Sequence, residues 1–541
     1  MHTEPSAPET GGEEPGFDPG PEGITGVGAR ALATVTAGLV LALFLAVLGQ
    51  TMLAVAMPDI VEDLGGFHRY SWPLTAYLVA SVVAIPIAGR LGDVFGRRPI
   101  LISGTALIVA GSILAFASQS ITQLSGSMAI QGAGAGGIMT ASLAAVADLF
   151  PPEQRGRYQG MLSAVSAVGL LAGLAVGGIV SDHLSWRWIF AITACCAVPV
   201  LLAQLAFPRL EPDGSSRKLD CPGMLALALA VVPVLVAISL AGADYPWRSW
   251  QVIGLVVLGS ISGVVFVIIE TRSDAPIISP AIYRRRPVAL SMVIAFLLGS
   301  GMYAVFLVVP LFLQSVKGTS ASSSGGLLAA MMGGLVVGSI VSGQCLSTAN
   351  PRYRRHAVMG TSAMTAGVAL LSGMDRNTAY GEATAYIIIV GFGIGAALTT
   401  ATVAVQNFTD RSTVGIATSA LQFWRTISGT LGLAVLGAIL RAAFATNLER
   451  SVAGGTRAAL SPGQFEAIRR DPQNYIGQDP VAVPEFAATA GDPDVLTAQL
   501  LEAVNSSLGR SISIVLAVCA ALVGLSVVAA LSLRPSRGAP G

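Results

Sequence analysis

Long apolar segments follow one another along most of this chain, and short polar connections separate them. Each segment has about 20 residues or more with few charges, the length an α-helix needs to cross about 30 Å of hydrocarbon. We therefore expect an all-α integral membrane protein. The pattern predicts about fourteen membrane-spanning helices, at 31–60, 71–91, 99–118, 121–149, 160–181, 188–207, 222–242, 250–270, 288–315, 322–346, 357–374, 381–406, 413–440 and 511–533.

Composition supports this prediction and excludes several classes of protein. Of the 541 residues, 53% are hydrophobic and 11% are charged, whereas soluble domains carry about 25% charged residues. The net charge of +1 offers no electrostatic attraction for nucleic acid. The five cysteines lack the spacing of metal ligands, and the four histidines are scattered along the chain. We expect no metal site, no cofactor and no catalytic constellation, so the sequence does not predict an enzyme.

One glycine-rich segment matches a pattern that is also found in dinucleotide-binding proteins. The segment "GAGAGG" at 132–137 fits the dinucleotide-binding pattern G-x-G-x-x-G. That pattern requires a preceding strand within a βαβ unit, and this copy lies inside an apolar segment. We expect these glycines to pack helices closely and not to bind a nucleotide.

Basic residues are distributed unevenly among the connections. Clusters at 97–98, 284–286 and 352–355 all fall on one side if the N-terminus is cytoplasmic, and the opposite connections hold few basic residues. Because Lys and Arg accumulate in cytoplasmic loops, this asymmetry predicts that both termini are cytoplasmic.

A weak internal repeat suggests two halves. The segment "GRLGDVFGRRPILISG" at 89–104 returns as "GQCLSTANPRYRRHAVMG" at 343–360. Like-oriented halves with a site between them are a known transporter plan. We expect six-helix halves at 30–207 and 288–533, with a linker carrying two inserted helices at 208–287.

The remaining segments are polar. Residues 1–29 are rich in Glu, Pro and Gly and predict a disordered cytoplasmic tail, without the features of a signal peptide. A second short cytoplasmic tail is expected at 534–541. Residues 441–510 predict a long loop on the outer side, either a tolerated insertion or a functional element.

The segment "GRLGDVFGRRP" at 89–99 concentrates charge between two apolar segments. Gly89 and Gly96 permit close approach of helix ends, and the charged residues can form an acid–base lattice in one conformation and lose it in another. The alternative is a charge cluster that only fixes topology. The candidate gate residues are Gly89, Asp93, Gly96, Arg97 and Arg98.

Together with "PPEQRGRYQG" at 151–160, "SWRWIF" at 185–190 and "LQFWRTISGTLGLAVLGAI" at 421–439, this segment resembles the major facilitator superfamily. The closest likeness is to its fourteen-helix drug:proton antiporter group, over nearly all of 31–533. The resemblance implies a bacterial inner-membrane transporter that exports amphipathic or hydrophobic small molecules by alternating access, coupled to protons. It also implies that the 89–99 segment closes the cytoplasmic side when the transporter faces outward. Export of a lipid or lipid-linked molecule, or facilitated transport without proton coupling, are the alternatives.

A second motif of the family has its counterpart at "GLLAGLAVGG", residues 169–178. It resembles the antiporter motif of the fifth helix, and its small residues allow tight helix packing. Leu174 stands where the family has proline. The motif residues are Gly169, Gly173, Gly177 and Gly178.

Two positions depart from the family pattern. Gly49 stands where the first helix usually carries an acid, and Met128 where the fourth usually carries an arginine. Charged residues inside a membrane are costly and usually functional, and in the family these two are thought to serve proton coupling. Their absence leaves three alternatives: coupling through other acids, coupling to another ion, or equilibration of the substrate without coupling. Asp148 and Asp93, near predicted inner helix ends, are the candidates for proton coupling, with a static structural role as the alternative.

Few polar side chains are predicted at mid-membrane depth. Arg425 is a basic residue placed within an apolar segment, where it needs a partner or a water-filled cavity. We expect it either to face a cavity and contact a substrate or another anion, or to donate hydrogen bonds to nearby backbone carbonyls. Gln50, Gln131 and Gln422 are further candidates for the substrate path, with ordinary interhelical hydrogen bonds as the alternative.

Overall fold

The computed structural model describes residues 29–65, 69–205, 219–241, 245–315, 321–348, 352–375, 378–452, 460–470 and 493–533. The predicted tails at 1–29 and 534–541 lie, except for Ala29, outside these ranges. The described chain is almost entirely helical. Its helices are α1 (Ala29–Leu64), α2 (Trp72–Phe95), α3 (Arg97–Phe116), α4 (Ile121–Leu149), α5 (Pro152–His183), α6 (Arg187–Leu205), α7 (Cys221–Leu240), α8 (Trp250–Arg272), α9 (Pro280–Arg284), α10 (Arg286–Ser315), α11 (Ala321–Leu346), α12 (Tyr353–Ser372), α13 (Tyr380–Asn407), α14 (Val414–Ser451), α16 (Pro462–Arg470) and α17 (Pro493–Leu531).

Thirteen of the described helices are long and apolar enough to cross a membrane. The helix α12 is not among them because it opens on the polar sequence "YRRH", but its 20 residues pack between α13 and α17. Each predicted apolar segment thus corresponds to a long helix. The prediction of an all-α, multi-span membrane protein is confirmed.

Local sequence explains where several helices begin. Gly96 alone separates α2 from α3, and its φ of 87° is a backbone conformation that favours glycine. Ser120 caps α4 by accepting a hydrogen bond from the Gln123 amide, and Asp220 caps α7 by accepting one from the Gly223 amide. These side chains occupy backbone donors that a helix start leaves unpaired.

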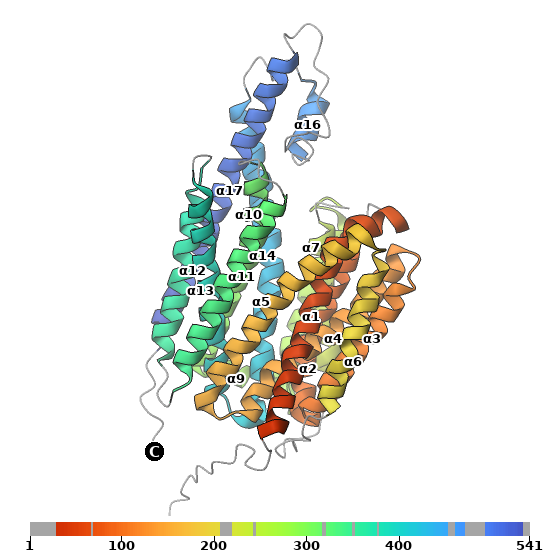
Figure 1. Ribbon diagram of the computed structural model, residues 1–541, viewed down its shortest axis with the longest axis vertical. Coiled ribbons are helices and arrows are strands. Elements are labelled where there is room, and N and C mark those ends of the chain that lie inside the picture. Colours follow the sequence, from red (N-terminus) through yellow and green to blue (C-terminus); the bar gives the residue numbers. More distant parts are fainter. Residues whose placement is uncertain are drawn as a thin grey trace, which may run out of the picture.

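The same packing order occurs twice along the chain. In the first set α2 packs on α4, α3 on α4 and α6, and α1 on α5. In the second set α11 packs on α13, α12 on α13 and α17, and α10 on α14. The two sets stand beside each other in Figure 1, the first in red to yellow and the second in green to blue. They meet where α5 packs on α11 and α2 packs on α14.

The helices α7 and α8 lie between the two sets in sequence and pack mainly on each other. The helix α7 also contacts α2 and α14, the two helices that meet across the halves. Its buried residues Leu227, Val231 and Leu235 join an apolar cluster with residues of both helices, such as Ile85 and Ile416. This hairpin therefore lies against the junction of the two sets.

The region 441–510 differs from the loop that its polar sequence predicts. The helix α14 continues to Ser451 and α17 begins at Pro493. With 38 and 39 residues, each is close to 60 Å long at about 1.5 Å per residue, about twice the hydrocarbon thickness. Together with α16 they extend beyond the other helices at the top of Figure 1.

An apolar core explains this extension. Leu500 and Val504 of α17 are buried with Phe444 and Leu448 of α14 and with Phe465 of α16. The first turns of α17 are thus one wall of a small helical core. The described parts of 441–510 are an ordered projection of the second set.

Candidate functional site

A buried charge network lies where α2 turns into α3. The side chain of Arg97 is 4% exposed and lies between two carboxylates. Its Nη2 is 2.5 Å from Oδ1 of Asp93, and its Nε is 2.7 Å from Oδ2 of Asp148. Burying a guanidinium is costly unless it is paired, and here two acids from α2 and α4 pair with it. We call Asp93, Arg97 and Asp148 the charge network.

Asp93 also connects the two sets of helices. Its Oδ1 accepts a hydrogen bond from the Gly415 amide at 3.1 Å, and its Oδ2 accepts one from the Ile416 amide at 2.8 Å. These amides belong to the first turn of α14, where donors are unpaired and the helix dipole attracts negative charge. The carboxylate therefore joins α2 to the start of α14.

Glycines allow this close approach. A Cβ at Gly415 would overlap Asp93 and Arg97, and one at Gly89 would overlap the Ser419 side chain of α14. Any larger residue at either position would force α2 and α14 apart.

Arg98 lies outside the charge network. Its Nη2 donates a 2.7 Å hydrogen bond to the carbonyl of Leu205, the last residue of α6. A cation at a helix C-terminus is stabilised by the dipole. The structure thus brings Asp93, Arg97 and Asp148 together. Gly89 lies where α2 approaches α14, and Gly96 forms the turn between α2 and α3. Arg98 makes a contact within the first set.

Arg155, on the first turn of α5, makes a second connection that the sequence did not assign. Its guanidinium donates to the carbonyls of Ala147 (2.8 Å) and Phe150 (3.1 Å) at the end of α4. It also donates to the carbonyl of Gln406 (3.1 Å) and to Oδ1 of Asn407 (2.8 Å) at the end of α13. One buried cation thus contacts helix C-termini of both sets. The signal was an arginine in the quoted segment "PPEQRGRYQG", but its partners lie far away in sequence.

The antiporter-motif glycines lie on α5, facing α1. A Cβ at Gly169 would be 3.2 Å from the Phe44 carbonyl oxygen, and one at Gly177 would be 3.0 Å from Cα of Met52. A Cβ at Gly173 would overlap Thr51 of α1. Gly178 faces open space. Three of the four glycines therefore serve the α1–α5 contact, and α5 runs unbroken through Leu174.

The two departures from the family pattern lie inside the first set of helices. A Cβ at Gly49 would be 3.5 Å from Cγ2 of Thr193 and 3.9 Å from Oε1 of Gln131, and Met128 is fully buried. Gln131 donates a 2.8 Å hydrogen bond from Nε2 to the Ser112 hydroxyl. Ser112 belongs to α3 and Gln131 is not part of the cavity lining described below, so Gln131 lies within the first set.

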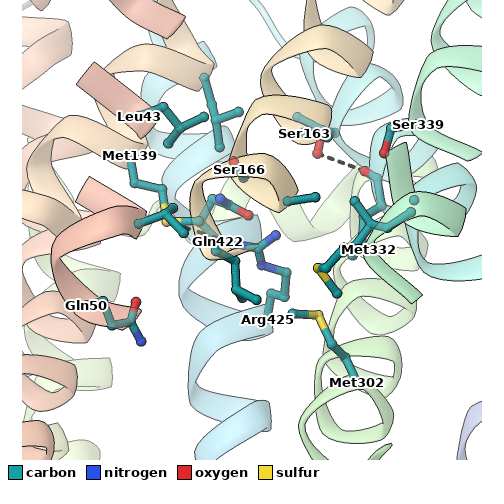
Figure 2. Close-up of a pocket in the computed structure, with 18 of the residues that line it drawn as sticks. Leu43, Gln50, Met139, Ser163, Ser166, Met302, Met332, Ser339, Gln422 and Arg425 are labelled. Carbon is teal, nitrogen blue, oxygen red and sulfur yellow. Dashed lines mark hydrogen bonds between the residues drawn. The ribbon is translucent and has the colours of Figure 1, made fainter. Parts of the chain in front are cut away.

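A cavity of about 320 Å³ lies between the two sets. Residues of α1, α4 and α5 line one side, and residues of α10, α11, α13 and α14 line the other. Its wall is mostly apolar and includes Met139, Met302 and Met332 (Figure 2). A cavity of this size and character is typical of small-molecule sites, and flexible methionines adapt to ligands of different shape.

Three of the four predicted substrate-path residues line this cavity: Gln50, Gln422 and Arg425. Close packing of α10 on α14 positions Arg425, since a Cβ at Gly299 would overlap its backbone carbonyl and one at Gly429 would overlap Tyr303. Within the described residues, its guanidinium makes one polar contact, from Nη2 to Sδ of Met139 at 4.0 Å. Figure 2 shows Arg425 and Gln422 extending from α14 into the same region.

Helices in two similar sets, with a cavity between them and cross-set connections at one end, define a membrane transporter of the alternating-access type. Residues 39–433 match the model of the Major Facilitator Superfamily, and the chain belongs to this family.

Several relatives support this assignment. The chain is 34% identical to Multidrug transporter protein MdtP of Bacillus subtilis, over 75% of this chain and 74% of that one. It is 31% identical to Multidrug resistance protein 3 of Bacillus subtilis, over 88% and 90%. The crystal structure of the human organic anion transporter MFSD10 shares the fold, with a TM-score of 0.55, 15% identity, and coverage of 75% of this chain and 93% of that one.

Proposed function

We propose that this protein is a secondary active exporter that moves amphipathic or hydrophobic small molecules across the membrane by alternating access. The observation that carries the proposal is the apolar cavity between the two sets, with the charge network and Arg155 joining the sets at one end. Breaking these contacts would open that end, and the substrate would cross without chemical change.

Two further observations support an export function. The relatives MdtP and Multidrug resistance protein 3 are named as multidrug proteins, and each matches about three quarters or more of this chain. The basic clusters at 97–98, 284–286 and 352–355 favour a plasma membrane orientation with both termini in the cytoplasm. The charge network then closes the cytoplasmic end, and the cavity is reached from outside.

Proton coupling is the energy source we propose, with Asp148 as the site. Its side chain is 19% exposed, compared with 2% for Asp93, so water reaches Asp148 more readily. Protonation of Asp148 would remove one of the two charges that hold Arg97. Proton binding would thus be linked to weakening of the closed end.

Export of a lipid or lipid-linked molecule is the second candidate. The projection formed by α14, α16 and α17 favours it, because this helical surface extends well beyond the expected membrane thickness and could guide a leaving lipid.

Purified protein in liposomes tests both candidates. We expect an imposed pH gradient to drive uphill movement of phenylnaphthylamine, a neutral fluorescent amphipath, and of no fluorescent phospholipid. Phospholipid movement without dye movement would favour the second candidate. Absence of any response to the gradient would contradict proton coupling.

A further inference from the structure

The cavity has an excess of hydrogen-bond donors on one wall. Arg425 offers a guanidinium whose polar contact, among the described residues, is a thioether sulfur. Three residues earlier on α14, Gln422 is 2% exposed, and its Nε2 has no hydrogen-bond partner there. Residues three apart share one face of a helix, so both donors face the cavity together (Figure 2).

Three hydroxyls of the lining already donate within their own helices. The hydroxyl of Thr51 donates to the Val47 carbonyl at 3.1 Å. The hydroxyl of Ser166 donates to the Leu162 carbonyl at 3.0 Å, and that of Thr402 to the Leu398 carbonyl at 2.9 Å. Arg425 and Gln422 thus stand together on one helix face with donors left for a ligand, and the Ser339 hydroxyl of the same lining also has no hydrogen-bond partner among the described residues.

The charge of Arg425 is also uncompensated. None of the described residues that line the cavity is Asp or Glu. Asp93 and Asp148 pair with Arg97 in the charge network, so neither neutralises Arg425. A buried guanidinium without an anion carries a large desolvation cost, which a bound anion offsets.

We propose that the cavity selects amphipathic organic anions, an inference that rests on the proposed function and names its substrate class. A carboxylate, sulfonate or phenolate group binds Arg425 and Gln422, because planar guanidinium donors match such oxygens. The apolar body of the molecule packs on Met139, Met302 and Met332. A lipophilic cation of the same size is repelled by Arg425 and finds no carboxylate in this wall.

A pair of matched probes tests the inference. Anilinonaphthalene sulfonate and phenylnaphthylamine share one ring system and differ by the sulfonate, and both fluoresce in apolar surroundings. Binding is measured to purified protein in nanodiscs of zwitterionic lipid, with empty nanodiscs subtracted. We expect the unmodified protein to bind the sulfonate probe about tenfold more tightly than the neutral probe. One charge-assisted hydrogen bond accounts for a difference in affinity of about this size.

Substitutions assign that preference to the cavity. Arg425→Gln should remove the tenfold preference, and the neutral-probe binding that remains shows that the variant is folded. Arg425→Lys should keep part of the preference. Arg450→Gln removes the same charge from an exposed position on the same helix and should change nothing.

Two results would overturn the inference. One is equal binding of both probes by the unmodified protein, and the other is a sulfonate preference that survives in Arg425→Gln. Because binding is measured without transport, loss of proton-driven export in liposomes would contradict the proposed function separately and leave the binding result standing.

Discussion

Arg97 and Arg425 are both arginines held inside the helical bundle, but their surroundings are opposite. Arg97 lies between Asp93 and Asp148, and Asp93 in turn accepts hydrogen bonds from backbone amides of α14. Arg425 faces the cavity without an acidic partner among the described residues. A paired buried charge favours the one arrangement in which its partners meet. An unpaired charge at a cavity remains available to bind a ligand of opposite charge.

The first prediction tests whether protonation of Asp148, a partner of Arg97, couples export to a proton gradient. Asp148→Asn imitates the protonated acid permanently, so we expect complete loss of uphill, gradient-driven export with downhill exchange retained. Measurement in liposomes with and without an imposed pH gradient separates the two activities. Uphill export equal to that of the unmodified protein would show that the coupling proton binds elsewhere.

The second prediction removes the connection between the sets. Asp93→Asn leaves Arg97 with one acid and weakens the contact with α14, and losing one partner of a buried pair costs about 3–5 kcal/mol. We expect export to fall by about tenfold or more at matched membrane abundance, because the closed end becomes less populated.

A matched control is available for Asp93→Asn. Asp63 pairs with Arg187 at 2.7 Å, but this pair is largely exposed, with 48% of the Asp63 side chain accessible. Exposed pairs contribute little because water and salt screen them, so Asp63→Asn should leave export nearly unchanged. Equal export by the two variants would show that the charge network fixes the membrane topology and has no role in transport.

The third prediction concerns the unpaired arginine. Arg425→Ala should lower export of an anionic substrate by about tenfold, the value of one charge-assisted contact. Arg425→Lys should lower it less, because the ammonium keeps the charge but not the planar guanidinium geometry. Equal loss of folded protein in both variants would instead indicate a packing role.

The sequence predicted the membrane helices well because one physical requirement, an apolar stretch of about 20 residues, defines each of them. It did not predict the projection of α14, α16 and α17. Leu500 and Phe444 are separated by many polar residues in sequence, and they are buried together in an apolar cluster that forms only in the folded chain. Hydropathy along the chain cannot register such mutual burial.

The site was predicted in part for a similar reason. Asp93 and Arg97 lie on either side of the Gly96 turn and only four residues apart, so the sequence already places them close together. The partners of Arg155 on α13 are more than two hundred residues away and become neighbours only in the fold. Polarity at mid-membrane depth identified Arg425, Gln422 and Gln131 alike, but it could not tell which of them faces the cavity.

The last and smallest predicted effects separate two of these residues, Gln422 and Gln131. Gln422 lines the cavity with an unpaired buried donor, so Gln422→Leu should lower export a few-fold and leave thermal stability unchanged or slightly higher. Gln131 lies within the first set and bonds Ser112, so Gln131→Leu should cost about 1 kcal/mol of stability and leave export at matched abundance unchanged. Thermal unfolding and liposome export, measured on both variants, give four values whose pattern is the test. If Gln131→Leu impaired export as much as Gln422→Leu did, the substrate path would have to include the interior of the first set, and a position in the cavity wall would no longer mark the site.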